Sequence, residues 1–106
     1  MNRISGHAAV AAALFALAAS AASAQAPASA TLGRNLSAQC ANCHGTNGKS
    51  VADVPSLAGQ SAATIVQKMQ DYRDGKLPAS IMHQLAKGYS DEQVVLMAEY
   101  FSKQAK

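Results

Sequence analysis

Apolar residues recur every three or four positions in three separate segments of this chain, which is the spacing of amphipathic helices. The first segment runs from about Thr31 to Gln39. The second begins near Ser61, a residue suited to cap a helix, and ends at Gly75. The third begins at Ser90, where Ser-Asp-Glu-Gln has the pattern of a capping box. No segment alternates convincingly as a strand would, so the sequence predicts an all-α domain.

The same spacing predicts which faces of the helices turn toward the core. On the first helix, Leu32 and Leu36 lie one turn apart, and Cys40 continues their face. Gly33 costs this helix stability, so it indicates either the close approach of another helix or an ordinary glycine near a helix end. The apolar positions expected on the second and third helices are Ile65, Met69, Tyr72, Val94, Met97, Tyr100 and Phe101.

The N-terminal residues 1–24 have the pattern of a secretory signal peptide. A positive start at Arg3 precedes an apolar run from Ala8 to Ala19, and Ala22-Ser23-Ala24 has the small-x-small form of a cleavage site. The apolar run is too short to span a bilayer, and we predict no membrane span after cleavage. Export also predicts a periplasmic protein, the uncleaved anchor being the alternative.

The part of the chain that follows this leader is small and nearly neutral. We predict residues 25–30 to be a flexible lead-in and residues 31–106 to be one domain. So short a chain buries a modest core and often needs an additional stabilising group that the core packs around or is linked by. Without Arg3 it has eight basic and six acidic residues, and a net charge of +2 is too weak to indicate nucleic-acid binding.

The two cysteines of the chain, Cys40 and Cys43, stand three positions apart and directly before His44. This spacing attaches a c-type haem: the thiols add to two vinyl groups of one porphyrin, and the imidazole takes an axial site on the iron. A structural zinc site would want four Cys or His ligands, and a thioredoxin-type redox pair would need a βαβ context. A disulfide between the two thiols would leave His44 unexplained. The sequence therefore predicts one covalently bound haem c.

The sixth ligand of the iron is predicted to be Met82. The other two methionines of the domain lie on apolar faces of regular helices, where methionine usually fills gaps. Met82 instead lies in a short helical turn over residues 80–87, closed by Gly88, and follows the irregular stretch 75–79. His83 is its rival, because imidazole is an equally good haem ligand. If Met82 binds the iron, His83 is expected to be a solvated surface histidine beside the pocket.

Several motifs accompany the cysteines: Gly33-Arg34-Asn35-Leu36, Cys40-Ala41-Asn42-Cys43-His44-Gly45, Pro55-Ser56-Leu57-Ala58-Gly59-Gln60, Met82 and Tyr100. With them, residues 30–104 resemble the small bacterial class I cytochromes c. The resemblance implies three main helices and a short helical turn wrapped around one haem. In that family the first and last helices cross near a glycine, which here would set Gly33 against Met97 and Tyr100.

The resemblance also implies a haem pocket around the proximal histidine. A proline carbonyl of the family, matched by Pro55, accepts a hydrogen bond from the imidazole, matched by His44. Such an acceptor fixes the tautomer of the ring and tunes its basicity as a ligand. A leucine matched by Leu57 packs against the porphyrin.

The segment from Ser80 to Glu92 has a narrower likeness, to the cytochrome subunits of flavocytochrome c sulfide dehydrogenases. Those subunits pair a haem chain with a flavoprotein that oxidises sulfide. The function implied is outer-sphere electron transfer by an electron-transfer protein rather than an enzyme, with redox proteins as partners, a sulfide dehydrogenase flavoprotein foremost. A free shuttle between other redox partners is the alternative. A haem-based sensor or enzyme is a third reading, which requires Met82 to leave the iron readily.

Overall fold

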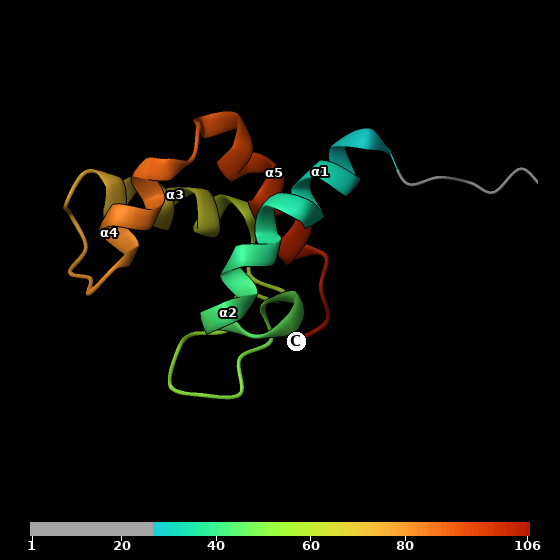
Figure 1. Cartoon of the computed structure of the whole chain (residues 1–106), viewed down its shortest axis with the longest axis horizontal. Helices are drawn as coiled ribbons and strands as arrows, with labels where there is room; N and C mark the ends of the chain where they lie inside the picture. The colour runs from blue at the N-terminus through green and yellow to red at the C-terminus, as the bar shows by residue number, and fades with distance from the viewer. Residues whose placement is uncertain (1–26) are drawn as a thin grey trace, which may run out of the picture.

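The computed structural model describes residues 27–106, and within that range the regular elements are all helices (Figure 1). The prediction of an all-α domain is confirmed. The predicted leader and the first residues of the lead-in lie outside the described residues. The α-helices of the described range are α1 (Ala28–Ser37), α2 (Ala41–His44), α3 (Ala62–Arg73), α4 (Met82–Leu85) and α5 (Asp91–Ser102), and short 3-10 turns occupy Ala38–Cys40, Thr46–Gly48 and Ala86–Gly88. Within residues 27–106 no helix is both long and apolar enough to cross a membrane.

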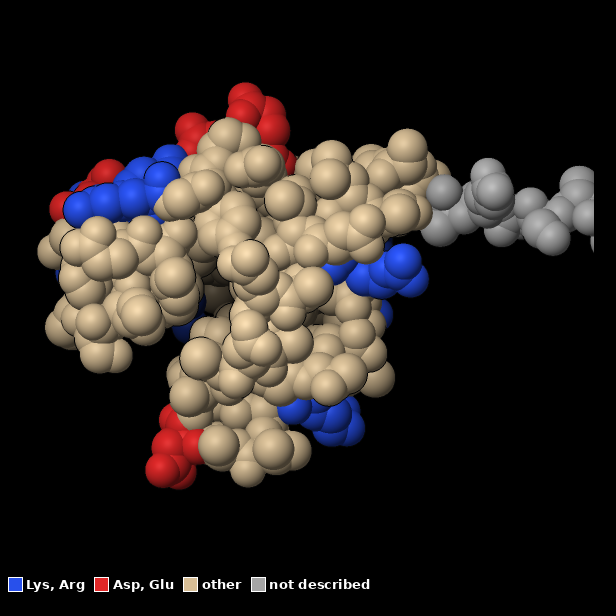
Figure 2. All heavy atoms as spheres, in the orientation of Figure 1, with Lys and Arg blue, Asp and Glu red and all other residues tan. Residues whose placement is uncertain are grey.

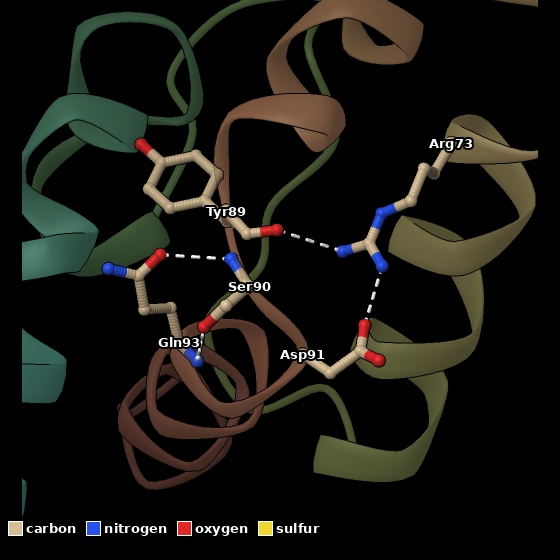
Figure 3. Close-up of polar contacts among 5 residues, drawn as sticks. All are labelled: Arg73, Tyr89, Ser90, Asp91 and Gln93. Atoms are coloured by element: carbon tan, nitrogen blue, oxygen red, sulfur yellow. Dashed lines mark hydrogen bonds and ion pairs between the residues drawn. The ribbon is translucent and has the colours of Figure 1, made fainter.

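The two predicted caps fix the beginnings of α3 and α5. The hydroxyl of Ser61 accepts from the Thr64 amide at 3.1 Å. The hydroxyl of Ser90 accepts from the Gln93 amide at 3.2 Å, while the Gln93 side-chain oxygen accepts from the Ser90 amide at 2.9 Å (Figure 3). Both helices therefore begin where the sequence predicted, because a local side chain satisfies amides that the helix leaves free.

Helix α1 begins at Ala28, earlier than the predicted start at Thr31. The end of the stretch predicted as a flexible lead-in is thus helical. Alanine has the best helix propensity of all residues. An alanine-rich stretch next to an apolar leader is therefore compatible with a continuation of the leader region and equally with the start of a helix. The 3-10 turn at Ala38–Cys40 then joins α1 to α2 without a loop.

The core lies between α3 and α5, whose predicted apolar faces are confirmed. Ile65 and Met69 of α3 are buried against three residues of α5, Val94, Met97 and Phe101. On α1 and the turn after it the predicted face is confirmed in part, because the half-buried Leu36 and Cys40 pack against the core and Leu32 does not. The buried residues there are Gly33 and Ser37, whereas Leu32 is 49% exposed and Leu36 is half-buried.

Helices α1 and α5 pack closely, and this explains why small residues face inward on α1 (Figure 1). A Cβ atom built on Gly33 would lie 2.6 Å from the backbone oxygen of Leu96 and 3.2 Å from its carbonyl carbon. The predicted crossing at Gly33 is therefore present. Its nearest contact is the backbone of Leu96 rather than the predicted Met97 and Tyr100.

We expect Gly33→Ala to lower the free energy of unfolding by about 1–3 kcal/mol, because the added methyl group must push the two helices apart. The loss should appear although alanine favours a helix by about 1 kcal/mol over glycine. Denaturant unfolding of the haem-loaded protein, followed by circular dichroism, measures it. Gly88→Ala is the control, since a Cβ on Gly88 meets nothing within 4 Å. Equal stability of the two variants would contradict the argument.

Candidate haem site

The two cysteines stand on either side of the start of α2. Both are free thiols, so the structure contains no disulfide between them. Cys40 is half-buried and packs against the core, whereas Cys43 is exposed. Burial, and to a smaller extent the charge of Cys43, raises the pKa of the Cys40 thiol above its ordinary value. The two thiols are therefore available for thioether bonds.

The imidazole of His44 is held by a backbone acceptor. Its Nδ1 lies 2.6 Å from the carbonyl oxygen of Pro55. Because a carbonyl can only accept, Nδ1 carries the proton, and the lone pair of the ring is left on Nε2. The hydrogen bond is the one that the family resemblance implied. It leaves Nε2 as the nitrogen able to bind a metal.

The loop after α2 brings Pro55 to the histidine. Helix α2 ends at Gly45, whose φ of 84° few other residues adopt. The carbonyl oxygen of Gly48 then accepts from the amide of Leu57 at 2.7 Å, which closes the loop that contains Pro55. A Cβ on Gly48 would lie 2.7 Å from the Phe101 ring, so the loop closes directly onto the core.

Met82 is the first residue of α4, and its half-buried side chain packs against the same buried cluster as Cys40 and Leu57. The fold thus gathers these three sequence-predicted residues around one core. His83 does not match its expectation as a solvated residue. It is half-buried, and its Nδ1 is inaccessible and has no hydrogen-bond partner among the described residues. Ala86, which directly follows this short helix, is fully buried.

Figure 2 shows a hollow between the lobe formed by α4 and its connecting loops and the part of the molecule that carries α2 and the loop after it. The donor set of the site fits a haem: two free thiols, an imidazole with Nε2 left as the metal-binding nitrogen, and a thioether. Within residues 27–106 no group of three or more His, Cys, Asp or Glu side chains could hold a bare metal ion. This donor set suits a porphyrin attached through two thiols.

Two residues near the site were missed by sequence reasoning. Burial, and secondarily the charge of Cys40, raises the pKa of the Tyr89 hydroxyl, so Tyr89 belongs to the surroundings of the cysteines. Arg73, the last residue of α3, donates to the Tyr89 carbonyl oxygen at 3.0 Å and to Asp91 at 2.5 Å (Figure 3). A basic residue in the last turn of a helix was the one available sign, and it usually reflects only the helix dipole.

Comparison of this sequence with known proteins agrees with the chemistry of the candidate haem site. A sequence model of the cytochrome c family, described as "Cytochrome c", matches residues 30–104. That range contains both cysteines, His44, Met82 and every helix from α2 onward. The matched part is most of the region that the structure describes.

Several curated bacterial proteins are similar over most of this chain. The cytochrome subunit of sulfide dehydrogenase from Chlorobaculum tepidum is 39% identical over 80 residues, which cover 76% of this chain and 73% of that protein. Cytochrome c-554(548) from Halomonas halodenitrificans is 38% identical over 79 residues, covering 71% of this chain and 95% of that protein. The thiosulfate dehydrogenase electron acceptor of Stutzerimonas stutzeri is 38% identical over 68 residues, covering 60% of this chain and 32% of that protein. The chain therefore belongs to the cytochrome c family, and it is an electron-transfer protein rather than an enzyme, with covalently bound haem c.

Proposed function

We propose that this chain is exported to the periplasm and carries electrons there through a haem bound to Cys40 and Cys43, with His44 and Met82 as axial ligands. The observation that carries the proposal is the 2.6 Å hydrogen bond between His44 and the Pro55 carbonyl, directly after the two free thiols. When bound, the haem supplies an iron that accepts one electron and gives it up again. The leader-like residues 1–24 support export, and the similar proteins are bacterial.

His44 and Met82 have different tasks in this proposal. Hydrogen bonding to Pro55 fixes the tautomer and the ring plane of the imidazole. A thioether favours the reduced state of the iron, so Met82 sets a higher potential than a second imidazole would. Leu57, half-buried against the core, supplies an apolar wall that excludes water. With both axial sites filled by side chains, no substrate has to bind the iron.

We propose a flavoprotein sulfide dehydrogenase as the electron donor. One support is the relative named as the cytochrome subunit of sulfide dehydrogenase, which shares 39% of aligned residues. The other is the surface beside Met82. Ile81 is 53% exposed and Leu85 is 45% exposed, and the visible face of the α4 lobe is mostly uncharged (Figure 2). Exposed apolar side chains next to a redox centre suit a lasting partner more than a fleeting encounter.

Mixing the purified haem protein with its candidate flavoprotein and adding sulfide tests this donor. We expect the haem to be reduced quickly within a complex that survives gel filtration, because electrons leaving the flavin singly need a nearby acceptor. The control is the same mixture without the flavoprotein. Slow reduction that is second order in concentration, without a complex, would instead support a free shuttle.

The shuttle remains the second candidate because of one observation. The 79 matched residues cover 95% of cytochrome c-554(548), so a protein of this family that is little longer than the matched region bears the name of a plain cytochrome. In that case the exposed Ile81 and Leu85 would serve several partners in turn. The double variant Ile81→Ser with Leu85→Ser tests the role of this surface. Loss of one stable complex would support the subunit. If no reduction rate changes, the surface serves neither a lasting partner nor a series of partners.

A further inference from the structure

The segment between α3 and α5, residues 74–89, leaves the core and returns to it, and it carries Met82 near its middle. Near its start, the amide of Lys76 donates to the Asp71 carbonyl oxygen at 2.8 Å. From 78 to 88, among the described residues, every hydrogen bond stays within the segment, as between the amides of Gln84 and Leu85 and the carbonyl oxygen of Ile81. Apolar packing of Met82 and Ala86 on the core therefore holds its middle.

Arg73 closes the segment at its base. It stands directly before the segment on α3, and its guanidinium binds the Tyr89 carbonyl oxygen and the Asp91 carboxylate on either side of Ser90 (Figure 3). One side chain thus joins the two ends of the excursion. The side chain is 28% exposed, and its Nε is buried with no hydrogen-bond partner among the described residues. Burying most of a guanidinium group costs desolvation free energy, and the two charge-assisted hydrogen bonds offset that cost.

We propose that Arg73 is a positioning residue that keeps Met82 on the iron by preventing the segment 74–89 from opening. The proposal rests on Met82 as the axial ligand, proposed above. Sulfur is a weak ligand of ferric iron, so opening of the segment competes with binding most strongly in the oxidised protein. Because the guanidinium of Arg73 holds the two ends of the segment 74–89 together, it lowers the population of the open form of that segment.

The two bonds of Arg73 are unequal. The Asp91 carboxylate is 69% exposed, and an exposed ion pair contributes little. The Tyr89 carbonyl oxygen is partly buried and receives a charged donor, which makes it the stronger tie. Lysine cannot reach both acceptors with one planar fork, so Arg73→Lys is expected to behave as a partial loss.

The test compares Arg73→Met with Asp91→Asn and with Lys68→Met in the ferric holoprotein. Lys68 is exposed on the same helix and makes no hydrogen bond or ion pair among residues 27–106. Lys68→Met therefore removes one positive charge from α3 without breaking a contact. We expect Arg73→Met to bind cyanide about tenfold faster, because cyanide enters when Met82 leaves. Asp91→Asn should change the rate by less than about fivefold, and Lys68→Met should not change it.

Amide hydrogen exchange is a second measurement, and it distinguishes local opening of the segment from a loss of global stability. Peptides covering 78–88 should exchange faster in Arg73→Met, while peptides of α1 and α5 keep their protection. Unchanged cyanide binding and unchanged exchange at 78–88 would overturn the role of Arg73. Failure of the ligand assignment has a different signature: Met82→Ala would then leave the absorption spectrum and the cyanide-binding rate as they are in the wild type, and the Arg73 proposal would fall with it.

Discussion

Replacing both Cys40 and Cys43 with alanine is expected to yield a chain without covalent haem and with little folded protein. The two thiols are the proposed attachment points, and both are free in the structure. The described core is small, and the half-buried Cys40, Leu57 and Met82 pack at its edge. A short chain that loses a large apolar plate from such an edge loses much of what it can bury.

Mass spectrometry and acid–acetone extraction after denaturation measure the attachment. The wild-type protein, made in a host able to mature cytochromes c, should retain one haem, and each single cysteine variant should retain it through one bond. Asn42→Ala is the matched control, since Asn42 is exposed between the two cysteines. A mature wild-type chain with two free thiols would remove the basis of the haem proposal.

Met82→Ala is expected to abolish the weak red absorption band of sulfur bound to ferric haem, and to open the iron to cyanide and carbon monoxide. The reduction potential should fall by on the order of 100 mV, since axial ligands are a main determinant of that potential. Alanine provides no donor, and the site behind it admits water. Absorption spectroscopy and a redox titration give the two results independently.

His83→Ala is the decisive partner experiment, because His83 is adjacent in sequence and half-buried as well. We expect it to keep the red band and the potential. If the wild-type protein lacks the red band, and His83→Ala rather than Met82→Ala opens the iron to cyanide and shifts the potential, the axial ligand is His83. Met69→Leu serves as the control for losing a methionine sulfur, since Met69 lies in the core on α3.

The parts of the fold that sequence predicted are those set by neighbouring residues. Ser61 and Ser90 cap their own helices, so the starts of α3 and α5 could be read locally. The start of α1 could not, since alanines suit both a leader and a helix. The exposure of Leu32 follows from the approach of α5 to Gly33, a contact between residues far apart in the chain.

The same division holds for the candidate site. The cysteine spacing predicted the attachment chemistry, and a family resemblance implied the contact between His44 and Pro55. The ties of Arg73 to Tyr89 and Asp91 were not predictable, since nothing in the sequence of a helix end states which carbonyl it will meet. The half-burial of His83 was missed for a similar reason, since nothing in the local sequence states how deeply α4 packs.

The acceptor that holds His44 is a main-chain oxygen, and every amino acid carries one. An alanine scan is therefore blind to this contact, because Pro55→Ala removes the ring and leaves the carbonyl. What encodes the tuning of the imidazole is the path of the loop between Gly48 and Leu57, closed by their 2.7 Å hydrogen bond. A change in loop length alters that path, and so does a side chain added at Gly45 or Gly48, where the backbone leaves no room for one. Natural or designed variation in potential through His44 should thus be sought among insertions, deletions and substitutions of these two glycines.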